Sequence, residues 1–466
     1  MLPRALLTVL AAGLLAAPAP AAPIRSQTLM PGVLYSKQVQ FTGHGPVVLN
    51  VVTAPRPAGL YSVHALLSNS AVQGRQRLTD MERGVSGTAT VVGLNADFFN
   101  LRWGNPSGVL VRGGALVTGG NGSRSAVGFD PTGSLHVDRV SLAATWKGTG
   151  QNWPMALNAP PAKNTTTLYT AAWGATTPPE SGATEAVLEP FPAAAPNRVL
   201  TVPVVQIAQA GSQPIPGDGA VVVARGAQAQ TLATEAPVGT AVGIRLILTP
   251  PWANVTEAVG GGPVLVRNGR PVFRANEAFT SGQLFQRSPR AAVGQTADGR
   301  LLFVAVDGGR PGYSTGMTSF ELALAMMRLG AVSASALGTG AYTGLAFDGT
   351  LLSRPSGKVE ASIADALVFS YSGVYAPPPP TIVAAGKTIS LAYKVVLPST
   401  VTATVTGADG TTATIAVGPR APGSYRVDWT PPATGRFTFS VAAQDDLGRR
   451  STAQRAFTVG NSTKRG

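Results

Sequence analysis

Short apolar stretches separated by turn residues run along most of the chain. Residues 47–52 and 62–67 alternate or run apolar, and residues 88–94 are rich in β-branched side chains. Short β-rich runs of this kind are typical of strands rather than helices. The 55 glycines and 38 prolines supply many turns and argue against a helical bundle. The pattern therefore predicts a strand-rich fold.

Two segments carry the signals of helices. Thr318 and Glu321 form a T-x-x-E capping box before an apolar stretch, and Gly330 stands just past its end. Apolar residues cover almost the whole surface of this helix, so we expect it to be buried. Residues 75–82, with Gly84 behind them, predict a second, short helix. Strands with a few helices predict a mixed α+β domain of the catalytic type.

The chain changes character after residue 375. Residues 376–380 read Ala-Pro-Pro-Pro-Pro, which is a stiff, extended spacer by composition. Beyond it, short alternating runs lie between residues 388 and 459, with turn residues between them. This spacing predicts an all-β, immunoglobulin-like sandwich. Residues 423–429 resemble the G-x-Y-x-V-x-W signature of bacterial Ig-like modules, which position or bind rather than catalyse.

The beginning of the chain predicts export. Residues 1–22 combine a short basic start, an apolar run too short to span a bilayer and small residues at 19–21, as a signal peptide does. Later stretches do not reach about 18 uninterrupted apolar residues, so we expect no transmembrane span. The protein is therefore expected to be secreted or held in the cell envelope. The other predicted segments are a catalytic-type domain, a Pro-rich linker, an Ig-like domain and a tail, at residues 23–375, 376–380, 381–460 and 461–466.

The composition of the chain excludes several kinds of catalytic and binding site. The sequence has no cysteine, which excludes disulfides, thiol nucleophiles and cysteine-based metal centres. Its three histidines are scattered singly, so a multi-histidine metal centre is not expected. The net charge of +14 is spread thinly, without the clustered basic stripe that nucleic-acid binding requires. We therefore expect no nucleic-acid partner, and instead a weak attraction to an anionic envelope polymer or a phosphate-bearing substrate.

Catalysis would then rest on carboxylates, arginine, hydroxyls and backbone amides. Four segments bring such groups together with glycines: residues 95–108, 260–263, 288–290 and 306–318. Glycines allow close backbone approach to an anion or a sugar, and a guanidinium can bind phosphate through two hydrogen bonds. Taken singly, each segment is better explained by turn glycines, an aspartate in a turn or a surface arginine.

The order of these segments resembles the phosphodiester glycosidase family over roughly residues 45–370. The family motif N-G-G/D-F-F is similar to residues 95–99, and G-G-G-P-x-L-V-x-N-G is found at residues 260–269. P-R-T-A-I-G is similar to residues 289–294. Four further similarities lie along the chain. The family's Y-T-x-x-W/Y-G segment, with its preceding asparagine, is similar to residues 168–174 and Asn158, and I-P-x-D-G matches residues 215–219. V-D-G-R and G-M-T-L-x-E-L-A are similar to residues 306–309 and 316–323.

The resemblance implies a site made from several of these segments. Asp97 and Asp307 would supply acid–base chemistry, and Arg290 would hold the phosphate. Substrate binding is further assigned to Asn95, Gly108, Gly261, Gly262 and Thr318. We expect Asp97, Arg290 and Asp307 to converge on one cleft with the glycine loop at residues 260–262. No residue is assigned as a metal ligand, although carboxylates beside glycines would also suit a divalent cation such as calcium.

One departure from the family pattern bears directly on activity. The family reads G-A-x-x-A-L-N-L-D-G-G-G-S-T-T-M after the buried helix, with an active-site aspartate in the loop. Here Gly338 stands where that aspartate is expected and Tyr342 where the serine is. The family's E-R pair is also replaced, by Glu360 and Ala361. Asp348 downstream is better explained as a turn residue than as a relocated acid.

Two functions of different classes follow from this departure. The first is an exported glycosidase that hydrolyses sugar-1-phosphodiester linkages in envelope or extracellular glycans. The second is a catalytically degenerate family member that binds a cell-envelope glycan, and a purely structural surface protein is a third alternative. Loss of one carboxylate and one arginine could cost several orders of magnitude in rate if both groups act in the transition state. The sequence does not identify the sugar, the aglycone or the oligomeric state.

Overall fold

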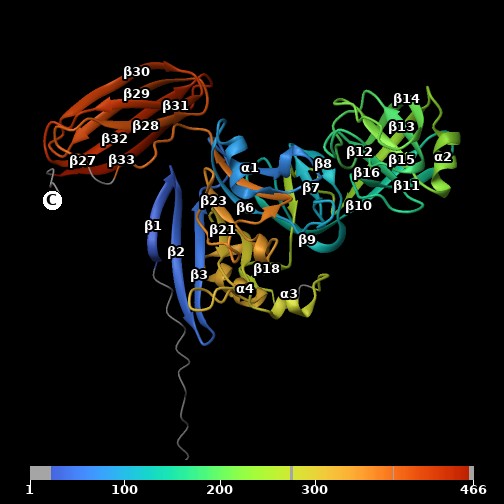
Figure 1. The fold of residues 1–466 in the computed structure, drawn as a ribbon, viewed down its shortest axis with the longest axis horizontal. Coiled ribbons are helices and arrows are strands. Elements are labelled where there is room, and N and C mark those ends of the chain that lie inside the picture. Colours follow the sequence, from blue (N-terminus) through green and yellow to red (C-terminus); the bar gives the residue numbers. More distant parts are fainter. Residues whose placement is uncertain (1–22, 273–275, 381–382, 461–466) are drawn as a thin grey trace, which may run out of the picture.

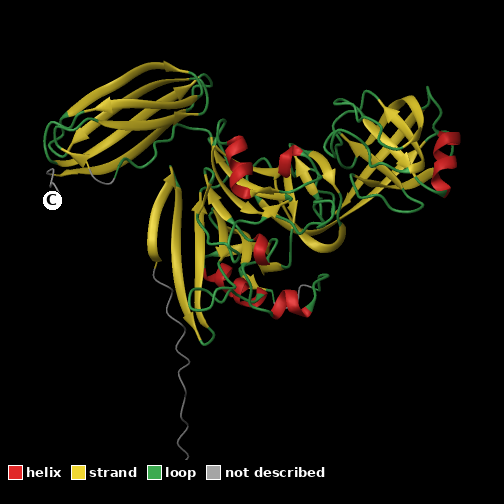
Figure 2. Cartoon of the chain, in the orientation of Figure 1, coloured by secondary structure: helices red, strands yellow, loops and turns green. Residues whose placement is uncertain are grey.

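The computed structural model describes residues 23–272, 276–380 and 383–460. Strands dominate it and form three bodies, which Figure 1 shows as a central body, a second body made from the middle of the chain and a C-terminal body. The helices lie at the outside of these bodies (Figure 2). The predicted signal peptide and the predicted tail at 461–466 lie outside the described residues.

The central body is built on two antiparallel sheets that share a core. The larger sheet has the order β1-β2-β3-β21-β20-β22-β18-β19. Its strands are Pro23–Met30, Val33–Thr42, Gly45–Ala54, Leu301–Val306, Arg290–Thr296, Ala331–Ala336, Val264–Arg267 and Arg270–Pro271. The smaller sheet has the order β24-β23-β6-β26-β4, with strands Thr350–Leu351, Leu345–Phe347, Thr90–Asn95, Asp365–Tyr371 and Tyr61–Leu67. Val52 and Phe303 of the larger sheet pack with Val92 and Leu367 of the smaller one.

Helices cover the outer faces of both sheets. Helix α4 (Ser319–Arg328) places Leu322 and Met326 in a core with β3, β18 and β21 of the larger sheet. Its predicted capping box is present, because the Thr318 side chain accepts from the Glu321 N–H at 3.1 Å and the Glu321 carboxylate accepts from the Thr318 N–H at 2.9 Å. Helix α1 (Leu78–Val85) covers the smaller sheet.

Helix α1 begins three residues later than the sequence pattern predicts. Residues Gln76–Arg77 form strand β5, which pairs with β25 (Ser362–Ile363). This pairing holds the start of the segment in extended form, so the helix begins only at Leu78. Two further short helices are α2 (Ala227–Glu235) and α3 (Ser281–Phe285).

The second body is a sheet that closes on itself. Strands β10, β11, β12, β15, β13, β14 and β16 pair in that order, and β16 pairs back to β10. They span Leu135–Lys147, Asn152–Leu157, Thr166–Thr170, Ala220–Ala224, Ser181–Leu188, Val199–Ala210 and Ala241–Thr249. Apolar side chains such as Trp146, Leu168 and Leu246 fill its interior. The same sheet continues through β9 (Asn121–Phe129), β17 (Glu257–Gly260), β7 (Leu110–Arg112) and β8 (Ala115–Thr118).

The C-terminal body is a β-sandwich. One sheet has the order β27-β33-β32-β29-β30, with strands Val383–Ala384, Arg450–Gly460, Gly435–Asp445, Ser399–Gly407 and Thr412–Arg420. The other pairs β28 (Ile389–Val395) with β31 (Gly423–Trp429). Leu391 and Phe439 from the two sheets meet in its core. The predicted strand-rich α+β domain followed by a β-sandwich is confirmed.

Close contacts join the sandwich to the central body. Val374 and Ala376, just before the tetraproline, lie in the core of the sandwich. The Lys394 ammonium donates to the backbone oxygens of Ser86 and Ala89 at 3.1 and 3.0 Å and to the Asp348 carboxylate at 3.0 Å. Independent folding of the two parts on either side of residues 376–380 stays a prediction. Within the described residues, no helix is long and apolar enough to cross a membrane.

Candidate active site

Asp97 lies where the central strand of the smaller sheet ends. Every residue of β6 is buried, and the chain leaves this strand at Asn95. The Asn95 side chain donates to the Gly338 carbonyl oxygen at 2.8 Å and accepts from the Gly344 N–H at 3.0 Å. Asn95 therefore holds the loop that follows β22, while Asp97, two residues on, reaches a cavity.

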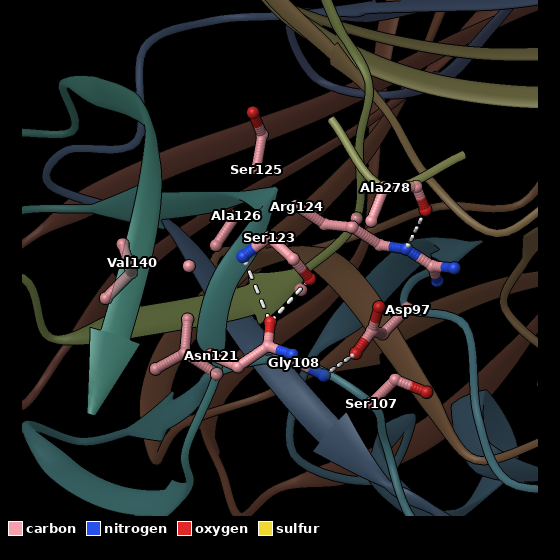
Figure 3. Close-up of a pocket in the computed structure, with 15 residues that line it drawn as sticks. Asp97, Ser107, Gly108, Asn121, Ser123, Arg124, Ser125, Ala126, Val140 and Ala278 are labelled. Carbon is pink, nitrogen blue, oxygen red and sulfur yellow. Dashed lines mark hydrogen bonds between the residues drawn. The ribbon is translucent and has the colours of Figure 1, made fainter. Parts of the chain in front are cut away.

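The cavity beside Asp97 has a volume of about 230 Å³, and its lining includes residues 120–126 and 260–261 together with Val140 and Ala278 (Figure 3). Its walls include Gly108, Gly260 and Gly261. A Cβ on Gly108 would lie 2.9 Å from the Gly260 Cα and 3.1 Å from the Asp97 Oδ2, and a Cβ on Gly260 would overlap the Asp97 carboxylate. These glycines are therefore required for the close packing of backbone around the carboxylate.

The Asp97 carboxylate is buried and held by backbone donors. Its Oδ2 accepts from the Gly108 N–H at 2.5 Å, and its Oδ1 accepts from the Phe98 N–H at 2.7 Å. Burial raises the pKa of Asp97 to about 6, although the two backbone hydrogen bonds and the charge of Arg124 oppose the rise. A carboxyl group with this pKa can exchange a proton near neutral pH.

Arg124, on β9, supplies the positive charge at this cavity. Its guanidinium carbon lies 4.9 Å from the Phe98 ring centre and 4.6 Å from the Phe279 ring centre. The Nε–H donates to the Ala278 carbonyl oxygen at 3.0 Å. Figure 3 shows the guanidinium on the Asp97 side of the cavity. Among the described residues, Arg124 donates a hydrogen bond from Nε alone, so its terminal nitrogens keep donors to spare.

A second buried carboxyl group stands behind Asp97. Asp365, at the start of β26, is 1% exposed, and its Oδ1 accepts from the Asp97 backbone N–H at 2.9 Å. Burial, reinforced by the nearby Asp97 charge, holds the pKa of Asp365 well above its usual range. Burial therefore favours the uncharged form of Asp365, and its hydrogen bond orients the Asp97 backbone.

Arg290 lies in a different environment. It is 2% exposed, and it donates from Nε to the Met317 carbonyl oxygen at 2.9 Å and from Nη2 to the Gln286 carbonyl oxygen at 2.8 Å. Burial lowers the pKa of Arg290 to about 10. Its guanidinium thus joins two loops of the protein and does not line the Asp97 cavity.

Asp307 is likewise engaged by the protein itself. It follows β21, the strand that pairs with β20, and is 2% exposed. Its Oδ1 accepts from the Asn50 side chain at 2.9 Å and from the Arg354 N–H at 3.0 Å, and its Oδ2 accepts from the Tyr313 hydroxyl at 2.7 Å. Burial raises the pKa of Asp307, and these hydrogen bonds oppose the rise. Asp307 does not line the cavity.

The loop containing Gly338 contacts both the segment that carries Asp97 and the segment that carries Arg290. The Gly338 N–H donates to the Ala96 carbonyl oxygen at 2.6 Å, and the Gly340 N–H donates to the Pro289 carbonyl oxygen at 3.0 Å. The loop thus separates Asp97 from the segment that carries Arg290. Of the residues predicted from sequence, Asp97, Gly108 and Gly261 line one cavity, and Asn95 and Gly262 adjoin it. Arg290, Asp307 and Thr318 lie at the ends of β20, β21 and α4, outside its lining.

Sequence reasoning missed Arg124 and Asp365. Arg124 follows the glycine-rich residues 119–122, a local signal that was not used because this segment lies outside the family motifs, and the pairing of β9 with β17 brings it to Asp97. Asp365 opens a buried strand, where an acidic residue has no local signature. In the described part of the chain, no three histidine or acidic side chains gather as metal ligands.

Three comparisons relate the chain to other proteins. Residues 198–370 match the family model of phosphodiester glycosidase, a span that includes the 260–262 glycines and Asp365 but neither Asp97 nor Arg124. The SPbeta prophage-derived uncharacterized protein YomE of Bacillus subtilis is 31% identical over 107 residues, which make up 23% of this chain and only 16% of that protein.

Two solved structures are similar over most of the chain. A hypothetical protein from Synechocystis shares 27% identity, covering 76% of this chain and 64% of its own, with a TM-score of 0.63. A protein of Burkholderia pseudomallei shares 20% identity, covering 70% of this chain and 74% of its own, with a TM-score of 0.57, and this likeness concerns the fold. Less than two thirds of the length of YomE and of the Synechocystis protein is therefore matched.

Proposed function

We propose that this protein, which carries the phosphodiester glycosidase domain, hydrolyses the bond between the anomeric carbon of a sugar and the oxygen of a phosphodiester. The observation that carries the proposal is the pairing of Asp97 and Arg124 at one cavity. A carboxyl group with a pKa of about 6 and a guanidinium with unused donors face the same space. This combination supplies a base and an anion-binding group, which are the two requirements of the reaction.

Asp97 acts as the general base in this proposal. Above about pH 6 it is ionised and accepts a proton from a water molecule, whose oxygen forms a new bond to the anomeric carbon. The bond from that carbon to the phosphate oxygen breaks, and its electron pair leaves with the phosphate as a phosphomonoester. The products are a free sugar and the phosphomonoester of the aglycone.

Arg124 stabilises the charge that grows on the departing phosphate. Its terminal N–H groups can form two hydrogen bonds to phosphate oxygens, and its Nε–H is already fixed by the Ala278 carbonyl. The two flanking rings hold the guanidinium in place, so little side-chain entropy is lost on binding. This role, assigned to Arg290 on the sequence alone, passes to Arg124 because the Arg290 donors meet backbone oxygens.

The expected substrates are glycans of the envelope or the exterior. The signal-like segment at residues 1–22 supports export, and the net charge of +14 favours an anionic polymer. Sugar-1-phosphodiester linkages carry one negative charge at each phosphate, so both features favour the same class of substrate.

A glycan-binding protein without catalysis is the second candidate. It is favoured by Gly338, which leaves the loop beside Asp97 without the carboxylate that the family pattern places there. Asp97 is the only carboxylate among the described residues that line the cavity. A site with one carboxylate can still hold a sugar phosphate through Arg124 and the backbone of its glycines.

Hydrolysis of a panel of sugar-1-phosphodiesters by the full chain tests the proposal, with and without a chelator. We expect release of the phosphomonoester, with kcat rising as the pH increases through about 6. Asp97→Asn should lower turnover by at least about a hundredfold, whereas Asp446→Asn, in an exposed turn of the sandwich, should not. Binding of the diesters without hydrolysis by the parent would replace the glycosidase with the glycan-binding protein.

A further inference from the structure

A second cavity lies next to the one that contains Asp97, and its walls are largely apolar. It has a volume of about 250 Å³. The apolar side chains around it come from β18, α3 and α4 and from the loop that leaves β19: Val264, Leu265, Val272, Leu284, Phe285 and Phe320. Phe285, at 68% exposed, is one of the large apolar side chains that the fold leaves in solvent. Apolar surface of this kind, left uncovered in a concave site, marks a binding site.

Two short segments connect the apolar cavity to the Asp97 cavity. Gly260 and Gly261 line the Asp97 cavity, and Pro263 and Val264, which follow them after Gly262, line the apolar one. In the second segment, Ala278 lines the Asp97 cavity while the next residue, Phe279, lines the apolar one. The same two segments therefore contribute to both cavities.

The second of these segments presents an apolar side chain to the apolar cavity. The Phe279 ring centre lies 4.6 Å from the Arg124 guanidinium carbon, and Phe279 also lines the apolar cavity. Glu277 is the acidic residue of this segment, and its carboxylate accepts from the Ser125 N–H, the Ser125 hydroxyl and the Val264 N–H at 2.6, 2.8 and 2.8 Å. Because these bonds occupy both of its oxygens, Glu277 acts as part of the cavity wall.

We infer that the apolar cavity binds the aglycone of the substrate, and that this aglycone is an alkyl or prenyl chain. The inference rests on the proposed function. A sugar-1-phosphodiester carries two organic groups, one on each side of the phosphate. With the sugar at Asp97 and the phosphate at Arg124, the second group leaves the polar cavity across Phe279, where the adjoining space is apolar. Transfer of a hydrocarbon chain from water into this cavity is favourable, whereas a second sugar would lose hydrogen bonds to water there.

Binding of alkyl phosphates tests this inference without requiring hydrolysis. These compounds are the phosphomonoester products expected from such substrates. Calorimetry with methyl, butyl, hexyl and octyl phosphate, each below its micelle concentration, should show Kd falling by roughly fourfold for each methylene that enters the cavity. Arg124→Gln should weaken the binding of every chain by a similar factor, because it removes the donor to the common phosphate.

Substitutions at the cavity locate the chain. The double variant Leu284→Gln, Phe285→Ser changes a half-buried and an exposed side chain of α3, and it should remove most of the dependence on chain length. The matched control is Phe41→Ser, at an 86% exposed position on β2, which should keep the dependence. Equal Kd values for all chain lengths would overturn the inference, and so would a length dependence that the double variant leaves intact.

The outcome for the inference is separable from the outcome for the proposed function. Hydrolysis of methyl and octyl diesters with equal KM would overturn the apolar aglycone while supporting the glycosidase. Length-dependent binding of alkyl phosphates without hydrolysis of any diester would support the aglycone site and overturn the glycosidase. Parental Kd values for every alkyl phosphate in Arg124→Gln would show that the chain binds apart from the phosphate site, and they would overturn the bridge between the cavities.

Discussion

A Cβ atom on Gly338 would lie 2.8 Å from the backbone carbonyl oxygen of Asp97. It would also lie 3.1 Å from the Ala96 carbonyl oxygen, to which the Gly338 N–H donates its hydrogen bond. The loop has therefore closed onto the strand end that carries Asp97. The position where the family places an aspartate has become a packing position, and the neighbouring backbone leaves no space for a side chain.

Restoring an aspartate at Gly338 should consequently destabilise the protein and not raise its activity. Gly338→Ala isolates the steric effect of the Cβ, and we expect it to lower the free energy of unfolding by about 1–3 kcal/mol. Gly338→Asp should cost at least as much. Urea unfolding measures both, with Gly217→Ala as a control because nothing lies within 4 Å of a Cβ there. A Gly338→Asp protein as stable as the parent and faster in hydrolysis would refute this expectation.

Arg124 and Arg290 should respond differently to the same substitution. Arg124→Gln should lower kcat/KM by about 10²–10³-fold through loss of charge stabilisation, with little change in the free energy of unfolding. Arg290→Gln should lower that free energy by about 2–4 kcal/mol, because it leaves the Met317 and Gln286 carbonyl oxygens without their donor. Hydrolysis and urea unfolding of both variants check this. If Arg290→Gln is as stable as the parent but inactive, the phosphate role returns to Arg290.

The raised pKa of Asp97 should make stability depend on pH with a defined sign. The folded protein holds this proton up to about pH 6, whereas the unfolded chain releases it near 3.8. The stabilisation is therefore complete below about pH 4 and is lost as the pH rises through 6. A shift of about 2 pKa units corresponds to roughly 3 kcal/mol.

Subtracting the unfolding curves of Asp97→Asn from those of the parent between pH 4 and 7 isolates the slope that depends on the Asp97 carboxyl group. Glu82, a buried carboxyl group elsewhere, contributes equally to both proteins and cancels, whereas Asp365 feels the Asp97 charge and is part of the difference. A difference that does not change with pH in this window would contradict the burial of an ionisable Asp97.

The contacts of Val374 and Ala376 predict where the sandwich can be cut. A fragment of residues 373–460 keeps both side chains in the core of the sandwich, whereas a fragment of residues 381–460 lacks them. We expect the shorter fragment to be less stable by about 1–3 kcal/mol, as for other losses of buried apolar groups. Thermal unfolding followed by circular dichroism compares the two fragments. Equal stability would show that the sandwich needs nothing before residue 381.

Lys394 should couple the sandwich to the central body. Its ammonium is nine-tenths buried and is held by two carbonyl oxygens and the Asp348 carboxylate. Lys394→Met removes these bonds while keeping the length of the side chain. We expect calorimetry to resolve two unfolding transitions in the variant where the parent shows a more cooperative one. An unchanged profile would indicate that the remaining contacts couple the two parts.

Much of the architecture could be predicted from local patterns. The α4 capping box depends on residues three apart, so Thr318 and Glu321 identify it without further information. The strands after residue 388 alternate in burial as their residue types alternate, since one face of each packs on the core. Asp97 could also be predicted as a site residue, because a polar segment directly after a buried strand emerges at the edge of a sheet.

Long-range strand pairing decided the rest of the site. Arg124 reaches Asp97 because β9 pairs with β17, and Asp365 reaches it because β26 lies beside β6. The direction of the Arg290 side chain was likewise beyond local reasoning, since the carbonyl oxygens that bind it come from the chain at residues 286 and 317. Residue types and spacing thus determine which groups are available for chemistry and which strands form. Which of those groups meet depends on contacts between segments far apart in the chain, and these form only when the sheets assemble.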